Sequence, residues 1–133
     1  MSKIIDGKKI SGEIKEELKE KVSKLKEKPC LVVISVGDNE ASKVYVNQKE
    51  KCANYIGINY KHVHFDDIND NDLINEINIL NNDKTVHGII VQLPLPKGMN
   101  EQKIVNSISV KKDVDGLTYL NAGLLLNNEK SLV

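Results

Sequence analysis

Apolar residues recur along the first part of the chain at spacings of four and three, as they do on one face of an α-helix. This pattern runs over residues 8–26, and Asp6 stands where a helix N-cap belongs. Pro29 prevents the helix from continuing into the next segment. The sequence therefore predicts an amphipathic helix with one apolar stripe, made of Ile10, Ile14, Leu18, Val22 and Leu25.

Three short segments have the patterns of β-strands. Residues 30–36 are almost wholly apolar and rich in β-branched side chains, which predicts a strand buried on both faces. Residues 60–65 alternate between apolar and polar, which predicts a strand with one less buried face. Residues 88–93 predict a third buried strand, ended by two prolines.

Helical patterns separate these strands. A helix is expected over residues 40–56, with Gly57 placed as its C-terminal stop. A second is expected over residues 70–80, with Asp70 or Asn71 as its cap.

Beyond the third strand the pattern predicts less regular structure. We expect a short helix over residues 100–107, a polar turn over 111–117 and a further helix from 119 to 126. The order strand, helix, strand, helix, strand predicts an α/β fold, a three-layer parallel-sheet domain with helices on both faces. No linker or repeat divides the chain, so we expect one domain over residues 1–133.

Composition narrows the function classes. The 19 basic and 19 acidic residues balance, so a nucleic-acid partner is not expected. No apolar stretch approaches the roughly 18 residues of a membrane helix, and the start of the chain lacks the apolar core of a secretory signal. Cys30 and Cys52 are expected to be reduced and buried in a cytoplasmic protein. The three histidines lack ligand-like spacing, so no metal site is expected.

Candidate chemistry lies where the predicted strands end, because open α/β sheets bind ligands beyond the carboxyl ends of their strands. On the helix over residues 40–56, Ser42, Tyr45 and Lys49 fall within about 60° of one another. An aromatic ring, a hydroxyl and an amine are thus expected together. In the alternative interpretation, Tyr45 only flanks the core and Lys49 is a surface charge.

Two other segments carry polar groups at such positions. Gln92 ends an otherwise apolar strand, and a buried amide there must find hydrogen-bond partners. Asp113 and Asp115 flank one apolar residue and would point the same way if the segment were extended. The alternatives are an ordinary strand exit with a satisfied glutamine and a solvated Asp-Gly turn.

Together these segments resemble the bifunctional methylenetetrahydrofolate dehydrogenase/methenyltetrahydrofolate cyclohydrolase family. Residues 36–49 are similar to its first signature, a glycine-led strand exit followed by Ser-x-x-Tyr-x-x-x-Lys. Residues 92–96 match its Gln-Leu-Pro-Leu-Pro exit, and residues 112–116 match its Lys-Asp-Val-Asp-Gly loop. Residues 4–7, Ile-Ile-Asp-Gly, resemble its opening. The motifs occur in family order and cover essentially the whole chain.

The resemblance implies a role for each matched residue. Lys49 is expected to be the catalytic lysine, and Gln92 is expected to be its hydrogen-bond partner. Both are therefore expected to be catalytic residues. Tyr45 is expected to stack on the pterin, Asp115 to bind the pterin's amino-pyrimidine edge, and Ser42 to have a lesser polar role in binding the substrate.

The resemblance also implies the reaction and its setting. The parent enzyme is expected to oxidise 5,10-methylenetetrahydrofolate with NADP and to hydrolyse the methenyl product to 10-formyltetrahydrofolate. It is expected to be a cytoplasmic homodimer in one-carbon metabolism, supplying purine and amino-acid biosynthesis.

The sequence departs from the family pattern in one respect. The full-length family chain has a second, Rossmann-type domain, but no G-x-G-x-x-G loop occurs in these 133 residues. The NADP site is therefore expected to be absent from this chain, which alone should be inactive as a dehydrogenase. The alternatives are a non-catalytic α/β module that binds folate or a nucleotide, and a fragment that depends on a partner.

Overall fold

The computed structural model describes residues 4–132 and contains a three-stranded parallel sheet. The strands are β1 (Cys30–Val36), β2 (Asn59–Phe65) and β3 (Gly88–Val91), in the order β2-β1-β3. The predictions that involve residues 1–3 and 133, at the two ends of the expected domain, lie outside the described residues. The parallel sheet confirms the predicted fold class.

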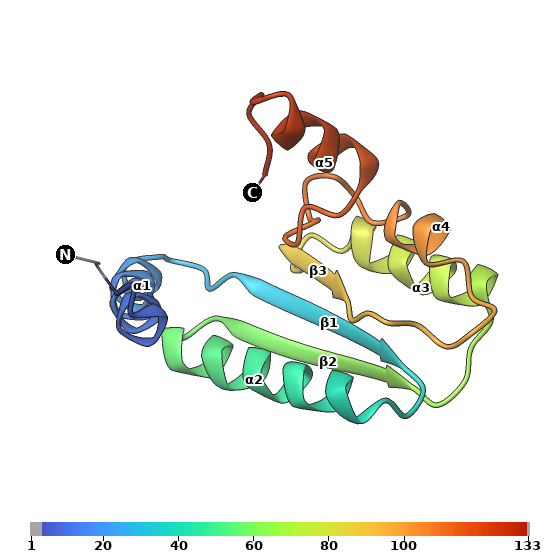
Figure 1. Cartoon of the computed structure of the whole chain (residues 1–133), viewed down its shortest axis with the longest axis horizontal. Helices are drawn as coiled ribbons and strands as arrows, with labels where there is room; N and C mark the ends of the chain where they lie inside the picture. Colours follow the sequence, from blue (N-terminus) through green and yellow to red (C-terminus); the bar gives the residue numbers. More distant parts are fainter. Residues whose placement is uncertain (1–3, 133) are drawn as a thin grey trace.

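Five helices complete the described part of the chain: α1 (Gly7–Ser23), α2 (Glu40–Ile56), α3 (Asp70–Asn82), α4 (Glu101–Val105) and α5 (Tyr119–Leu126). In Figure 1, α2 lies along one face of the sheet and α3 and α4 lie along the other. Helix α5 and the C-terminal end stand beyond α4, away from β2 (Figure 1). Within residues 4–132, no helix is both long enough and apolar enough to cross a membrane.

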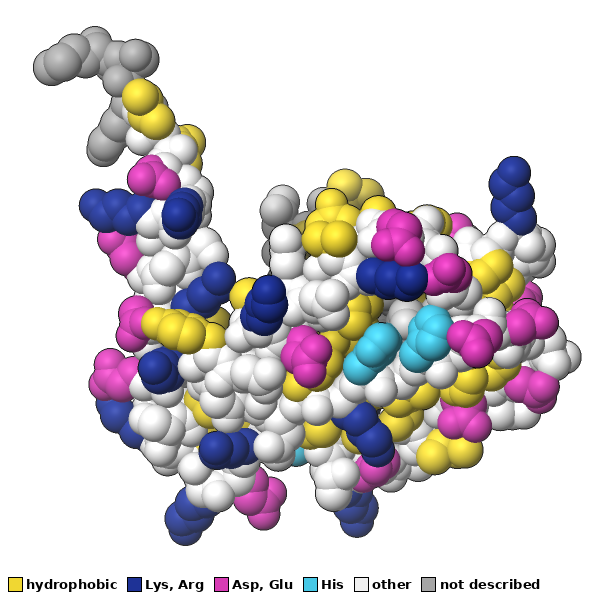
Figure 2. Space-filling view, turned by 90° about the horizontal axis from the view of Figure 1, so that it is seen from below, with side chains coloured by type: hydrophobic (Ala, Val, Ile, Leu, Met, Phe, Trp, Pro, Cys, Tyr) yellow, Lys and Arg dark blue, Asp and Glu magenta, His cyan; other side chains and the backbone are white. Residues whose placement is uncertain are grey.

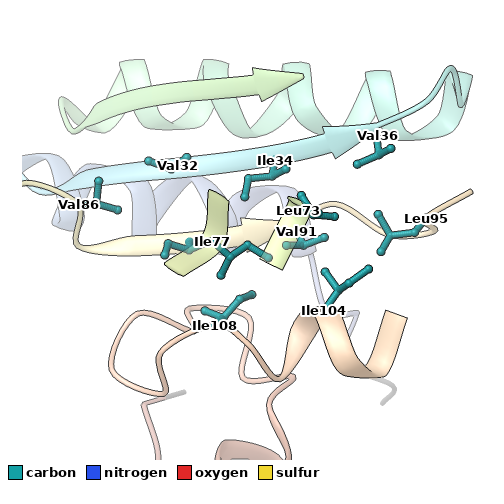
Figure 3. Packing of buried hydrophobic residues seen from close by; sticks show 11 residues of the cluster. Val32, Ile34, Val36, Leu73, Ile77, Val86, Val91, Leu95, Ile104 and Ile108 are labelled. Carbon is teal, nitrogen blue, oxygen red and sulfur yellow. The ribbon is translucent and has the colours of Figure 1, made fainter. Parts of the chain in front are cut away.

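The alternation of side chains along β1 divides the core into two clusters. Val32 and Ile34 point toward α3 and pack in one cluster with Leu73, as Figure 3 shows. Val33 points to the opposite face and packs with Val46 of α2. The side chains of Val32, Val33 and Ile34 are all fully buried, which confirms that β1 is covered on both faces.

Capping residues define where the helices begin and end. Asp6 accepts a hydrogen bond from the Lys9 backbone N–H at 3.0 Å, as predicted. Gly57 ends α2 in the left-handed conformation, with φ at 86°, also as predicted. The cap predicted for α3 was wrong: Asn69, not Asp70 or Asn71, accepts from the Asp72 N–H at 3.0 Å. Asn69 is the residue with extended backbone before the first helical turn, which is what a cap requires.

The prediction for α1 needs a larger correction. The helix ends at Ser23, and of its apolar stripe only Val22 is buried. Ile10, Ile14 and Leu18 are 44%, 51% and 39% exposed. Helix α1 lies beside α2 at one end of the sheet rather than on a face of it, so most of the stripe has no sheet surface to cover it (Figure 1).

Two smaller differences concern the strands and the cysteines. Strand β3 ends at Val91, although the Gln92 backbone N–H still donates to the Ile34 carbonyl at 2.8 Å. Cys30 and Cys52 are free thiols as expected, but both are half-buried rather than buried.

Residues 111–117 contain a turn, as predicted, but the segment is not wholly solvated. Asp113 is 1% exposed and forms an isolated bridge with Ile89 of β3. Its carboxylate accepts hydrogen bonds from the Thr118 N–H at 2.9 Å, the Thr118 hydroxyl at 2.7 Å and the Asn121 side chain at 2.9 Å. Asp113 therefore faces inward and ties this loop to the start of α5. Asp115 remains exposed, so the expected same-side placement of the two carboxylates fails because the segment turns instead of extending.

Gly88 brings this loop close to the sheet. A Cβ atom at position 88 would lie 2.8 Å from Cγ1 of Val114 and 3.3 Å from Cδ1 of Leu31. Such distances are too short for ordinary packing, so only glycine allows the loop to rest on β3 at this point.

Hydrogen bonding determines the charge state of Asp113. Desolvation by itself would raise its pKa, but the hydrogen bonds from Asn121, Thr118 and Leu117 together outweigh it, and the pKa lies below the usual value. A carboxyl group with a lowered folded-state pKa stabilises the fold at neutral pH, and this stabilisation is lost as pH falls through that pKa.

We predict that Asp113→Asn lowers the free energy of unfolding by about 1.5–3 kcal/mol at neutral pH, because it removes a buried charged acceptor. The difference from the wild type should shrink as pH falls below the ordinary aspartate range, where Asp113 itself becomes neutral. Urea unfolding across this pH range measures both effects, with the exposed Asp67→Asn as the control. An equal loss of stability at all pH values would contradict the role of the charge.

Candidate functional site

Predicted site residues lie at the exits of two strands and on a loop that packs against β3. Helix α2 begins shortly after β1, Gln92 follows β3 directly, and the loop with Asp115 lies against β3. Helix α2 and Gln92 therefore meet beyond β3, whereas the loop with Asp115 pairs near the beginning of that strand. Helix α2 contributes Ser42, Tyr45 and Lys49, which were predicted to share one side of it.

The central contact joins Lys49 to Gln92. The Lys49 amine donates to Oε1 of Gln92 at 2.8 Å, while Nε2 of Gln92 donates to the Leu93 carbonyl at 3.0 Å. Because a carbonyl can only accept, the second bond fixes which end of the amide faces the lysine. Gln92 is 9% exposed, so its orientation is also restrained by packing. The amine is held by a neutral acceptor and not by a carboxylate.

Tyr45 lies beside this pair with its ring open to solvent. The Lys49 amine is 5.9 Å from the centre of the ring, and Tyr45 is 56% exposed. An exposed aromatic ring next to a held amine offers a flat surface on which a planar ring can stack.

Asp115 lies within electrostatic reach of the same amine. Desolvation by the surrounding chain raises the pKa of Asp115, the Lys49 cation opposes this shift, and the Asp113 carboxylate adds to it. The residue nonetheless remains solvent-exposed, so its carboxylate is accessible to a ligand. The structure thus brings Tyr45, Lys49 and Gln92 together and places Asp115 within electrostatic reach of Lys49.

Ser42 is placed differently from the other predicted residues. It is 8% exposed and lines a hollow of about 280 Å³ together with Gln92. Tyr45, Lys49 and Asp115 are not among the residues that line this hollow. Ser42 and Gln92 therefore line a second space, which Lys49 does not reach.

The sequence interpretation did not identify three further polar residues in that hollow. Ser35 of β1 lies 2.8 Å from Nε2 of His62 and 2.9 Å from Nδ1 of His64, both on β2. The two histidines are two residues apart on one strand and therefore share a face. That spacing was visible in the sequence, but their contact with Ser35 depends on the register that pairs it with His64.

Comparison with known proteins identifies relatives along nearly the whole chain. The sequence profile of the tetrahydrofolate dehydrogenase/cyclohydrolase catalytic domain matches residues 5–115. The bifunctional protein FolD of Wolbachia pipientis subsp. Culex pipiens (strain wPip) is 47% identical over 136 residues, which cover 98% of this chain and 46% of the relative.

Solved structures agree with the sequence match. The bifunctional FolD methylenetetrahydrofolate dehydrogenase/cyclohydrolase of Campylobacter jejuni superposes with a TM-score of 0.91 at 47% identity, covering 95% of this chain and 46% of that one. The Trypanosoma brucei methylenetetrahydrofolate dehydrogenase-cyclohydrolase, solved with NADP cofactor and an inhibitor, gives a TM-score of 0.90 at 30% identity, covering 98% and 46%.

The chain spans about half the length of these relatives. The profile match nevertheless includes most of the chain, and it contains all five predicted site residues. This chain belongs to the tetrahydrofolate dehydrogenase/cyclohydrolase family, in the region of its catalytic domain.

Proposed function

We propose that this chain is the tetrahydrofolate-binding catalytic domain of a methylenetetrahydrofolate dehydrogenase/cyclohydrolase, a cytoplasmic enzyme of one-carbon metabolism that supplies purine and amino-acid biosynthesis. The observation that carries the proposal is the hydrogen bond between Lys49 and Gln92, with Tyr45 beside it. A module that only binds folate or a nucleotide has no need of an amine held by a neutral amide. The pair therefore favours catalysis over the binding-only alternative.

The substrate's pterin fits the two groups that flank the lysine. Its flat ring would stack on the exposed face of Tyr45, a contact worth about 0.5–1.5 kcal/mol beyond area burial. Its amino-pyrimidine edge would donate two hydrogen bonds to the Asp115 carboxylate, at about 1.5–3 kcal/mol each. These two contacts would place the one-carbon unit near the Lys49 amine.

The hydrolytic step requires both protons to leave the oxygen of the attacking water and one proton to be delivered to a folate nitrogen. Water adds to the methenyl carbon of the cationic substrate, and the deprotonated Lys49 amine takes the proton that this water loses. In the adduct the bond between the one-carbon unit and folate N5 then breaks, the adduct's hydroxyl loses its proton to solvent as the formyl C=O forms, and the Lys49 ammonium delivers a proton to N5, so one proton is released overall. The product is 10-formyltetrahydrofolate. Gln92 keeps the amine in place through a neutral amide oxygen.

The described residues do not fit a dinucleotide cofactor. The turn after β1 contains the single glycine Gly37, and a Cβ atom there would lie 3.1 Å from Cγ of Pro96. A dinucleotide-binding turn of the Rossmann kind uses several glycines, and this turn has only one, with Pro96 packed close to it. We therefore assign to this chain the folate and hydrolytic groups, and place the NADP site of the parent enzyme outside these 133 residues.

We predict that Lys49→Met in the full-length enzyme lowers methenyltetrahydrofolate hydrolysis by about 10²–10⁴-fold, the usual contribution of a general acid/base. Folate binding should be largely retained, because the stacking and carboxylate contacts remain. The loss of methenyl absorbance measures the rate, and Lys51→Met on the same helix is the matched control. Activity within about twofold of the wild type would place the base elsewhere.

For Asp115→Ala we predict weaker folate binding, with a rise in KM of at least about tenfold and a smaller change in kcat. The proposed bonds exist in both the ground and transition states, so their loss affects mainly binding. Because the pKa of Asp115 is raised, wild-type binding should weaken on acidification at a higher pH than for an ordinary aspartate. A collapsed kcat with an unchanged KM would contradict this role.

The 133-residue chain assayed alone should not reduce NADP when it is supplied with methylenetetrahydrofolate. Hydride transfer requires the nicotinamide to be held about 3–3.5 Å from the substrate carbon, and no described residue is arranged to do this. Absorbance of the reduced nicotinamide measures the reaction. Clear NADP reduction by the purified chain would reveal a dinucleotide site within it.

A further inference from the structure

The turn that carries Asp115 positions this side chain through its backbone alone. Asp115 is exposed, and no residue between 4 and 132 forms a hydrogen bond with its carboxylate. The Lys49 amine acts on it only through the electrostatic attraction between the two charges. The direction of the Asp115 carboxylate therefore depends on how firmly the turn around it is held.

Asp113 closes this turn with both its backbone and its side chain. The three consecutive backbone N–H groups that follow Asp115 all donate to this one residue. The Gly116 N–H donates to its carbonyl at 3.2 Å, the Leu117 N–H to its carboxylate at 3.2 Å, and the Thr118 N–H to the same carboxylate at 2.9 Å. Gly116 has φ at 68°, in the left-handed region, which allows the chain to turn back at this point. The position of Asp115 thus follows from the orientation of the Asp113 carboxylate.

Two side chains at the start of α5 fix that orientation. The Thr118 hydroxyl donates to Oδ2 of Asp113 at 2.7 Å, and Nδ2 of Asn121 donates to the same oxygen at 2.9 Å. Nδ2 of Asn121 also donates to the Val110 carbonyl at 3.0 Å, so it joins the chain before Asp113 to α5. Thr118 and Asn121 are 2% and 1% exposed, so neither side chain can touch a ligand. An influence of either residue on binding would have to pass through Asp113.

The placement of Asp115 matters because the proposed substrate is held at two points of one rigid ring. Tyr45 would stack on the pterin while Asp115 pairs with its edge, and a rigid ring cannot adjust to a displaced carboxylate. A turn that is already held in one conformation also loses less entropy when the ligand binds. On the face shown in Figure 2, acidic and basic side chains are intermixed, so that face offers no broad charged surface to replace this contact.

We propose that Thr118 and Asn121 are positioning residues for the folate substrate. They orient the Asp113 carboxylate, and Asp113 holds the turn in the conformation in which Asp115 binds the amino-pyrimidine edge. The inference rests on the proposed function, in which Asp115 contacts the pterin. It extends the residues that determine folate affinity to the start of α5, beyond residue 115, where the match to the family profile ends.

The test uses the full-length enzyme and measures KM and kcat for the hydrolysis of methenyltetrahydrofolate. Thr118→Val keeps the shape of the side chain but removes the hydroxyl that donates to Asp113. We expect KM to rise by about three- to tenfold and kcat to change by less than about twofold, because Lys49 and Gln92 are untouched. Thr118→Ser keeps the hydroxyl, so its KM should be within about twofold of the wild-type value.

The separation of KM from kcat distinguishes positioning from a loss of stability. A less stable enzyme would contain a smaller active fraction, which lowers the apparent kcat but leaves the KM of the folded molecules unchanged. Thr85→Val is the matched control and should change neither parameter. The Thr85 hydroxyl makes the same kind of bond, to the Asp83 carboxylate at 2.7 Å, in the turn that follows α3. If Thr118→Val does not fold, Asn121→Ala removes the other side-chain donor and has the same expected KM.

A double-mutant cycle shows whether the effect passes through Asp115. In the Asp115→Ala background, Thr118→Val should raise KM by less than about a further twofold, because the group that it positions is already absent. An equal factor in both backgrounds would overturn the positioning role alone. So would an unchanged KM in Thr118→Val and Asn121→Ala when that of Asp115→Ala is raised. An unchanged KM in Asp115→Ala would instead refute the proposed contact between Asp115 and the pterin, and the positioning role with it.

Discussion

The pairing of β1 with a parallel strand on each side is the constraint on which the rest of the molecule depends. Because all three strands run the same way, their polar exits meet at one edge, and side chains more than forty residues apart come within hydrogen-bond distance. The same pairing splits β1 between two clusters, with Val32 facing α3 and Val33 facing α2. Packing on both faces holds the strands in place, and it thereby also positions the site residues attached to them.

The sequence predicts well those helices and strands whose bounds follow from local periodicity. The bounds of α2 and the stop at Gly57 follow from apolar spacing and one glycine, and the structure confirms them. The predictions fail where the environment of a residue depends on contacts between distant parts of the chain. The exposure of Ile14 depends on where α1 packs, and the burial of Asp113 depends on Thr118 and Asn121 reaching back to it. Spacing along the chain contains no information about either.

The candidate site shows the same division. Family motifs pointed to Lys49 and Gln92, and their contact is present, while the catalytic and binding roles remain predictions. Ser35 and the histidines of β2 belong to no such motif, and only the strand register brings them together. Gln92 belongs to both groups: it accepts a hydrogen bond from the Lys49 amine and also lines the hollow of about 280 Å³. A substitution of Gln92 would therefore alter both the contact with Lys49 and the lining of the hollow.

Gly88 extends this dependence to a position that touches neither the lysine nor any predicted ligand. A methyl group there would press on Val114, which stands between the buried Asp113 and the exposed Asp115. The loop is anchored on its far side by the Asp113 hydrogen bonds, so it has little freedom to absorb the displacement. A larger residue at position 88 thus requires the side chains at positions 114 and 31 to shift or to become smaller. Substitutions at position 88 are therefore expected to be accompanied by changes at these distant positions.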